Sequence, residues 1–345
     1  MKCRISEGLF AAALFSLSAL HSVNAQPTLT TLHTFTGASD GANPNTGLIL
    51  SGNTLYGTAG GGSSGNGTVF KVNTNGTSFT NLYSFTKISG TYPYFTNSDG
   101  AGPNPVILSG NTLYGTAGAG GSSNRGTVFR VNTDGTSFTN LHNFTGGSDG
   151  AGPYAGVILS GNTLYGTTVA GGGASNGTVF KLSTSGTGFT TLHSFTPTSS
   201  STNSDGAWPH GSLILSGKML YGTIPAGGSF GHGTVFAVNT DGAGFTNLHS
   251  FSGGNNYKYG GSWAGLILSG NTLYGTTQMG GSSYYGTVFK VNTNGTGFTI
   301  LHNFSEIDPV TYSNSDGACP YANLILSSNT LYGTAEQGGS SVMGA

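Results

Sequence analysis

The chain has 345 residues, of which 62 are Gly and only 6% are charged, and its formal net charge at pH 7 is -1. An ordinary globular domain has about a quarter of its residues charged, so ion pairs cannot be the main source of stability here. The sequence has no basic cluster that could neutralise phosphate groups, which excludes the usual basis of nucleic-acid binding. We expect no nucleic-acid partner.

The N-terminal 25 residues differ from the rest of the chain. Lys2 and Arg4 precede the apolar run LFAAALFSLSAL, and a pattern of small residues ends just before Gln26. This arrangement is typical of a secretory signal peptide, so we expect residues 1–25 to be cleaved and the protein to be exported to the periplasm, the cell surface or the medium. Later apolar stretches are shorter than the roughly 20 residues of a membrane-spanning helix, so we expect no transmembrane segment.

The mature chain, residues 26–345, contains one cysteine, Cys319. An intramolecular disulfide is therefore excluded, and stability must come from packing. About 320 residues are ample for one large core, and we expect a single domain that acts as a monomer.

Internal repeats dominate the remaining sequence. The motif LYGT occurs six times with a period of 51 to 58 residues, and its tyrosines are Tyr56, Tyr114, Tyr165, Tyr221, Tyr274 and Tyr332. The motif GTVF occurs five times, beginning at Gly67, Gly126, Gly177, Gly233 and Gly286. Each repeat contains four short apolar runs, as in GLILSG, NTLYGT, GTVFKVNT and FTNLHSF, separated by Gly and Asn. Such runs indicate β-strands joined by tight turns.

Four antiparallel strands in about 50 residues, repeated six times, match the blades of a β-propeller. The order of the motifs is also similar to that of kelch repeats. We therefore predict an all-β fold, a six-bladed kelch-like β-propeller with four-stranded blades. A right-handed β-solenoid is the alternative.

The two ends of the repeat array are expected to meet in the last blade. The segment TLTTLHTF at residues 28–35 resembles the fourth strand of a repeat, and no third strand precedes it. The last repeat reaches Ala345 at the start of its third strand. We expect residues 28–35 to close an incomplete sixth blade, leaving either a slot or a collapsed three-stranded blade. A C-terminally truncated sequence is one explanation, and completion by another chain is the alternative.

The combined motif LYGTT...GG...GTVF resembles the GloVer (Gloeo/Verruco) tandem repeat of exported bacterial proteins, over residues 28–345. The resemblance implies a repeat propeller that is exported, with C-terminal anchors that vary among members and with no established catalytic activity.

Aromatic residues recur where a ligand could bind. One position near the end of the loop is aromatic in four consecutive repeats, as Tyr154, His210, Trp263 and Tyr321, and in three of these repeats a proline precedes it. With Trp208 these are our candidate ligand-binding residues, because they would line the mouth of the channel if the first strand is innermost. Flat aromatic faces suit sugar rings, and the neutral Asn and Thr around them supply hydrogen bonds. The alternative is that these rings pack between blades.

A carboxylate recurs in the loops that follow the fourth strand, as Asp40, Asp99, Asp149, Asp205 and Asp316, with Lys258 at the aligned place in one repeat. Equivalent positions in neighbouring blades should lie about 10 Å or more apart, too far to share one metal ion. We expect structural Asx-turns in which the carboxylates accept backbone N–H groups. The recurring His33, His142, His193, His249 and His302 are expected to be structural for the same reason.

The sequence nominates no catalytic residue, metal site or cofactor. Cys319 is the only candidate for the cross-linked cysteine of a copper-radical oxidase, and the glycine runs lack the Lys of a P-loop. We expect an exported or cell-surface binding module for carbohydrate or another neutral polymer. A polysaccharide hydrolase or lyase and a scaffold without a ligand are the alternatives.

Overall fold

The computed structural model describes residues 29–90, 96–252, 261–340 and 344. The predicted signal peptide, residues 1–25, lies outside the described residues. Every regular secondary-structure element among the described residues is a β-strand, so the all-β prediction is confirmed. A helix long and apolar enough to cross a membrane does not occur among these residues. The chain divides into two compact units, residues 1–143 and 144–345, which are described in turn.

The first unit holds two antiparallel sheets. The first sheet has the order β1-β2-β3-β4, with bounds Ile49–Ser51, Thr54–Ala59, Thr68–Asn73 and Thr80–Ser84. The second sheet contains β6 to β9, with bounds Ile107–Ser109, Thr112–Ala119, Thr127–Asn132 and Thr139–Asn143. A short additional strand, β5 (Ala101–Pro103), also pairs with β7.

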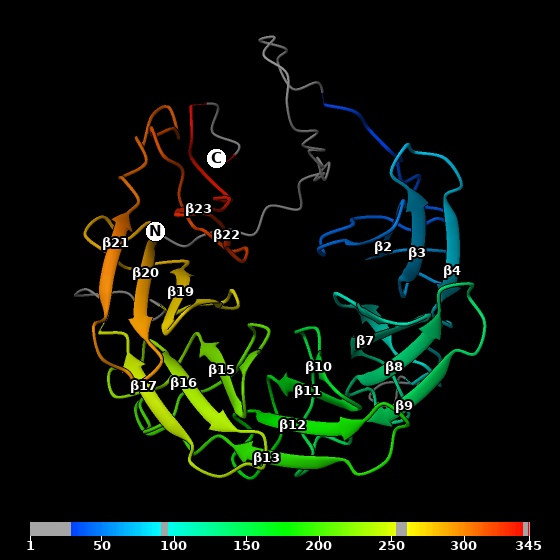
Figure 1. The fold of residues 1–345 in the computed structure, drawn as a ribbon, viewed down its shortest axis with the longest axis horizontal. Helices are drawn as coiled ribbons and strands as arrows, with labels where there is room; N and C mark the ends of the chain where they lie inside the picture. The colour runs from blue at the N-terminus through cyan, green and yellow to red at the C-terminus, as the bar shows by residue number, and fades with distance from the viewer. Residues whose placement is uncertain (1–28, 91–95, 253–260, 341–343, 345) are drawn as a thin grey trace. The chain divides into compact units, whose positions relative to one another are not determined.

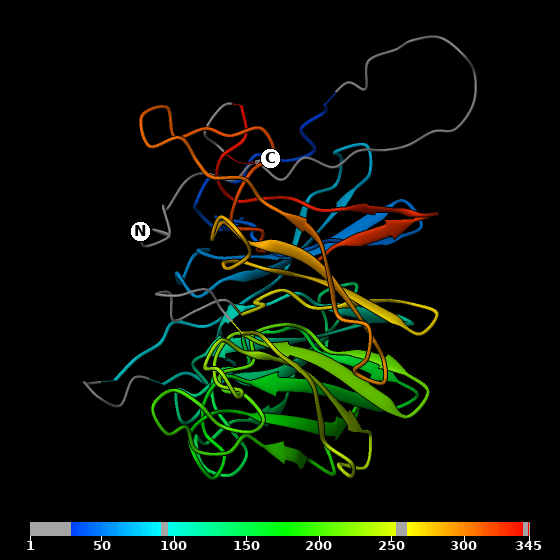
Figure 2. The ribbon, with the colours of Figure 1, turned by 90° about the vertical axis from the view of Figure 1, so that its left-hand side faces the viewer.

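Among its described residues, the second unit holds three four-stranded sheets and a two-stranded one. The sheets have the sequential orders β10-β11-β12-β13, β14-β15-β16-β17, β18-β19-β20-β21 and β22-β23. Strands β10 to β13 have the bounds Ile158–Ser160, Thr163–Thr168, Thr178–Ser183 and Thr190–Ser194, and strands β14 to β17 have the bounds Ile214–Ser216, Met219–Ile224, Thr234–Asn239 and Thr246–Ser250. Strands β18 to β21 have the bounds Ile267–Ser269, Thr272–Thr277, Thr287–Asn292 and Thr299–Asn303. Strands β22 and β23 have the bounds Ile325–Ser327 and Thr330–Tyr332. Within this unit the fourth strands β13, β17 and β21 lie on the outer side (Figure 1), and consecutive sheets stack face against face (Figure 2).

The repeat motifs form the strands for local reasons. The first two strands of a repeat pair across a two-residue turn, as in Ser51↔Thr54, with Gly52 in the left-handed region at φ 56°. The second strand lies between two neighbours in its sheet and is buried on both faces, as β2 shows, which explains the nearly continuous apolar run LYGT. Gly57 leaves room for an aromatic ring, because a Cβ there would lie 2.8 Å from the Phe70 ring.

The core is formed between consecutive sheets. In the second unit, Leu192 and Phe195, at the end of one sheet, pack against Leu220, Phe236 and Val238 of the next sheet. Each of these side chains is at most 8% exposed. One repeat therefore cannot bury its apolar face alone, and each sheet stabilises its neighbour.

The predicted strand at residues 28–35 is wrong for residues 29–35, which form none. A strand needs a hydrogen-bonded neighbour, and the described residues provide none here. Leu32 and Phe35 instead pack against a cluster of β2 and β3 residues. The sixth repeat forms a two-stranded sheet among the described residues, rather than the collapsed three-stranded blade considered above. The number of blades in one ring and its closure stay predictions.

Candidate functional site

Four predicted ligand-binding residues of the second unit lie next to one another. The ring centroids of Tyr154 and His210 are 5.8 Å apart, those of His210 and Trp263 are 4.3 Å apart, and those of Trp263 and Tyr321 are 6.0 Å apart. The first and last pairs are stacked, with interplanar angles of 3° and 25°. We call this row the aromatic ladder. Each ring comes from the loop that enters a different sheet.

The aromatic ladder lines a cavity of about 300 Å³. Tyr154 and Tyr321, at its two ends, are 50% and 48% exposed, while His210 and Trp263 are half-buried. The fifth predicted residue, Trp208, is 43% exposed but does not contribute to the cavity lining. In the first unit the equivalent positions are Asn45 and Asn104, so the aromatic character of this position is confined to the second unit.

Backbone contacts with the preceding repeat hold these loops in place. The residue before the proline lies in the left-handed region, at φ 65° for Trp208 and φ 54° for Cys319. The Trp208 N–H donates to the Asn176 carbonyl at 2.9 Å, in the loop before the third strand of the preceding sheet. Pro209 then packs over Gly177, where a Cβ would lie 2.8 Å from the proline ring. The His210 side chain therefore starts from a backbone that these contacts hold in place.

The centre of the aromatic ladder carries no charge at neutral pH. Burial lowers the pKa of His210 to about 4, so its imidazole is neutral above that value. Burial raises the pKa of Tyr321, and the nearby carboxylate of Glu336 raises it further. Burial also raises the pKa of Glu336 itself, although its hydrogen bond with Gln278 acts in the opposite direction.

Sequence reasoning missed Glu336 and Gln278 as neighbours of this site. Both follow the LYGT strand at a position where the other four repeats have Gly60, Gly118, Val169 and Pro225. A change from small or apolar residues to polar ones in two consecutive repeats was the available signal. The two residues give the Tyr321 end of the aromatic ladder a hydrogen-bonding group and an ionisable carboxyl.

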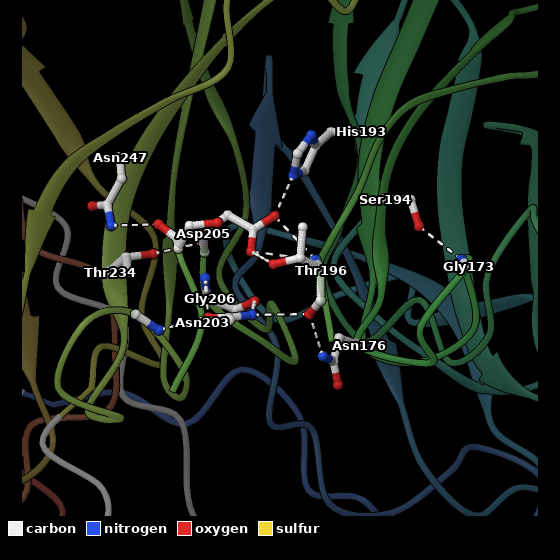
Figure 3. Close-up of polar contacts among 12 residues, drawn as sticks. Gly173, Asn176, His193, Ser194, Thr196, Asn203, Asp205, Gly206, Thr234 and Asn247 are labelled. Carbon is white, nitrogen blue, oxygen red and sulfur yellow. Dashed lines mark hydrogen bonds and ion pairs between the residues drawn. The ribbon is translucent and has the colours of Figure 1, made fainter. Parts of the chain in front are cut away.

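The recurring aspartates hold the loops that follow the fourth strands through hydrogen bonds to their carboxylates. Asp205 is 3% exposed and accepts hydrogen bonds from His193 Nε2 at 2.8 Å and from the Thr196 N–H at 3.0 Å (Figure 3). The Thr196 hydroxyl also donates to it. Burial opposes ionisation, but the hydrogen bonds from His193 and Thr196 hold the pKa of Asp205 below its ordinary value. In addition, the Thr234 hydroxyl donates to the Asp205 carbonyl at 3.2 Å.

The same arrangement recurs with small changes. The Asp40 carboxylate accepts hydrogen bonds from His33 and Thr36, and the Asp316 carboxylate accepts them from His302 and Ser305. The Asp99 carboxylate accepts hydrogen bonds from Tyr83 and Thr86, and the Asp149 carboxylate accepts one from the Thr145 N–H. The donors precede the carboxylate in the chain, which differs from the predicted Asx-turn, where the donor follows by two residues. The ends of the fourth strands leave N–H groups that the carboxylates satisfy. Asx-turns occur instead in the hairpins before the fourth strands, at Asn75, Asp134, Asp241 and Asn294.

The imidazoles at this recurring position also stack on the next repeat. The ring centroids of His193 and Phe245 are 3.8 Å apart with an interplanar angle of 9°, and those of His249 and Phe298 are 3.6 Å apart with an angle of 7°. His193 therefore links a loop, a strand and the neighbouring sheet. Within the described ranges, no three His, Cys, Asp or Glu side chains group closely enough to hold a metal ion.

Comparison with known proteins identifies the repeat. The family described as the Gloeobacter/Verrucomicrobia repeat matches residues 94–259 and 196–345. The chain belongs to this family. Since the two matches overlap and together extend from residue 94 to residue 345, the Gloeobacter/Verrucomicrobia repeat accounts for more than half of the chain, and the predicted membership is confirmed.

Other comparisons show only distant similarity. No curated protein matches the chain. Among solved structures, a nidogen/laminin complex is similar with a TM-score of 0.45 and 14% identity over 77% of this chain and 78% of that one. TolB from Acinetobacter baumannii has a TM-score of 0.43 and 12% identity over 74% and 53% of the two chains. The tricorn protease has a TM-score of 0.43 and 13% identity over 84% and 26%.

Proposed function

We propose that this chain is a binding module whose ligand is a neutral carbohydrate, held on the aromatic ladder. The observation that carries the proposal is the meeting of Tyr154, His210, Trp263 and Tyr321 in one cavity. Rings that served only as packing between sheets would be buried, as the core phenylalanines are, but the two terminal rings are about half exposed. Exposed aromatic faces offer apolar contact area together with polar tips.

The chemistry of the surroundings favours a neutral ligand. His210 is uncharged at neutral pH, because burial lowers its pKa to about 4. Glu336 is the ionisable group that interacts with the end of the ladder, through Tyr321. A glycosidase needs a second carboxyl group at about 5 to 9.5 Å, and the described cavity lining is formed by the four aromatic side chains. Binding without turnover is therefore the function we propose.

Affinity electrophoresis tests this proposal. The full chain would be run through native gels containing neutral polysaccharides, together with Trp263→Ala and the matched control Trp208→Gly. The control removes the other tryptophan and introduces the residue that the second and third repeats carry at this position, Gly102 and Gly152. We expect retardation of the wild type and of the control, and its loss in Trp263→Ala.

Two other results would contradict the proposal. Unretarded migration of the wild type in every gel would reject a carbohydrate ligand of the polymers tested. Equal retardation of Trp263→Ala and wild type would show that the polymer binds elsewhere on the molecule. Release of reducing sugar during the same incubation would instead support the hydrolase alternative.

The proposed setting of this site is an exported six-bladed propeller. The six blades are proposed from the six LYGT copies, and export is proposed from the N-terminal pattern of residues 1–25. N-terminal sequencing of the secreted protein should begin at Gln26. Small-angle X-ray scattering of residues 26–345 should give a radius of gyration of about 20 Å for a closed, compact ring, and an open arc would give a clearly larger value.

A further inference from the structure

The polar atoms at the centre of the aromatic ladder are not used by the described part of the chain. Among the described residues, neither the imidazole of His210 nor the indole N–H of Trp263 has a hydrogen-bond partner. Both side chains line the cavity, and their nitrogens are not fully enclosed by protein atoms. By contrast, the imidazoles of His193 and His302 in the same unit each hydrogen-bond with a carboxylate at 2.8 Å. The centre of the ladder therefore keeps hydrogen-bonding capacity for a ligand.

Neighbouring polar groups hold the backbone of this site. The Ser262 hydroxyl, next to Trp263 in the chain, is buried and donates to the Ala264 carbonyl at 3.2 Å. The Thr223 hydroxyl, from the second strand of the preceding sheet, donates to the same carbonyl. In the first unit, the ladder position is occupied by Asn104, whose amide donates to a threonine hydroxyl of β7 at 3.1 Å. The unused polar atoms therefore belong to the aromatic residues of the second unit and are not a property of every repeat.

The unused atoms include donors and an acceptor. The indole N–H of Trp263 can only donate a hydrogen bond. The imidazole of His210 is neutral at pH 7, because burial lowers its pKa to about 4, and a neutral imidazole has one donor and one acceptor nitrogen. A half-buried donor that loses water without gaining a partner costs free energy. A ligand must therefore bring polar atoms to these two rings, since contact with the aromatic faces alone would leave them unsatisfied.

The spacing of the two rings selects the kind of polar group. Their centroids are 4.3 Å apart and their planes are inclined by 46°, so a donor and an acceptor are presented close together. Two hydroxyl groups on adjacent carbons of a sugar ring lie side by side, and each can donate and accept. One can accept from the Trp263 N–H while its neighbour donates to the acceptor nitrogen of His210. An acetamido group fits less well, because its N–H and C=O point in opposite directions.

We propose that His210 and Trp263 recognise two free hydroxyl groups on adjacent carbons of one sugar ring, and that the site therefore selects neutral polysaccharides with such vicinal diols. This inference rests on the proposed function, carbohydrate binding at the aromatic ladder. Backbone residues of many 1,4-linked and 1,6-linked polysaccharides carry free vicinal diols. The inner residues of a 1,3-linked glucan do not, because the linkage occupies the carbon between the two ring hydroxyls. Tyr154 and Tyr321 contact the neighbouring sugar units through their ring faces.

The wild-type protein and a set of polymers provide the first test. The full chain is run in native gels that contain xylan, galactomannan, dextran or a linear 1,3-linked glucan, and dissociation constants are obtained from the retardation at several polymer concentrations. We expect binding to at least one of the first three polymers, at least about tenfold tighter than to the 1,3-linked glucan. Equal or tighter binding to the 1,3-linked glucan would overturn this inference but leave carbohydrate binding intact. Migration without retardation in all four gels would contradict both proposals.

Two conservative variants then locate the contacts. Trp263→Phe and His210→Phe keep an aromatic ring but remove the indole donor and the imidazole nitrogens. Each should weaken binding to the preferred polymer by about tenfold and leave the weaker binding to the 1,3-linked glucan unchanged. The matched control Trp208→Phe removes the N–H of the tryptophan outside the cavity lining and should alter neither affinity. A preference between polymers that survives in both cavity variants would overturn the inference, and partial misfolding cannot produce a change in the ratio of two affinities.

Discussion

Removal of the Asp205 carboxylate should test whether the links between loop and strand hold the repeats together. In Asp205→Ala, three donors lose their acceptor: His193 Nε2, the Thr196 N–H and the Thr196 hydroxyl. An unsatisfied buried donor costs about 1–3 kcal/mol. His193 and Thr196 are half-buried, so water replaces part of the loss. We expect the free energy of unfolding to fall by about 2–4 kcal/mol.

The assay is urea unfolding followed by tryptophan fluorescence. Both tryptophans, Trp208 and Trp263, lie in the second unit, so the signal reports on the unit that contains Asp205. The matched control is Asp241→Ala, because the exposed Asp241 accepts one backbone hydrogen bond, from Ala243 at 2.9 Å. The control should change the free energy of unfolding by about 0.5 kcal/mol. Equal losses in the two variants would refute the reasoning.

The pH dependence provides a second check on the same variant. The pKa of Asp205 in the folded protein lies below its ordinary value, so the carboxylate contributes stability above the unfolded pKa of about 3.9. That contribution is lost as the pH falls through the lower folded pKa. The difference between wild type and Asp205→Ala should therefore be largest near pH 7 and shrink below about pH 4. A difference that stays constant across this range would contradict a role for the charged carboxylate.

Three further predictions concern the backbone and the aromatic ladder. Gly177→Ala should destabilise the protein far more than Gly188→Ala in urea unfolding, because a Cβ on Gly177 would lie 2.2 Å from the Thr168 carbonyl oxygen, whereas nothing lies within 4 Å of one on Gly188. The folded-state pKa of His210 is about 4, so between about pH 6.5 and pH 4 the unfolded chain takes up a proton at this residue and the folded chain does not. The wild type should therefore lose stability on acidification, and His210→Asn should lose less. The measurement is the unfolding temperature at pH 7 and at pH 5. Burial raises the pKa of Glu336, so ionisation of its carboxyl destabilises the folded state as the pH rises. Glu336→Gln should therefore raise the unfolding temperature at pH 7. It should not do so at pH 3, where the carboxyl is protonated in both the folded and the unfolded state.

Much of the fold follows from local sequence rules. The alternation of LYGT and GTVF with Gly and Asn turns predicts four strands per repeat, and the observed sheets have that order. These rules act over a few residues, through side-chain alternation and turn chemistry. They failed for residues 29–35, because a strand also requires a partner that its own sequence does not contain. The same limitation applies to β23, whose length is three residues where its counterparts have six or eight.

The sequence by itself determined which positions recur, including the aromatic residue of four loops and the aspartate of five. Only the tertiary structure decided that Trp263 belongs to the cavity and Trp208 does not, and that the Asp205 carboxylate reaches back to His193 on the preceding strand. The rings of His210 and Trp263 are 53 residues apart in the chain and 4.3 Å apart in space. Such proximity depends on how one sheet packs against the next, which is set by contacts such as Phe195 on Phe236. A repeat period gives the spacing of residues along the chain, but it does not give the angle between two packed sheets.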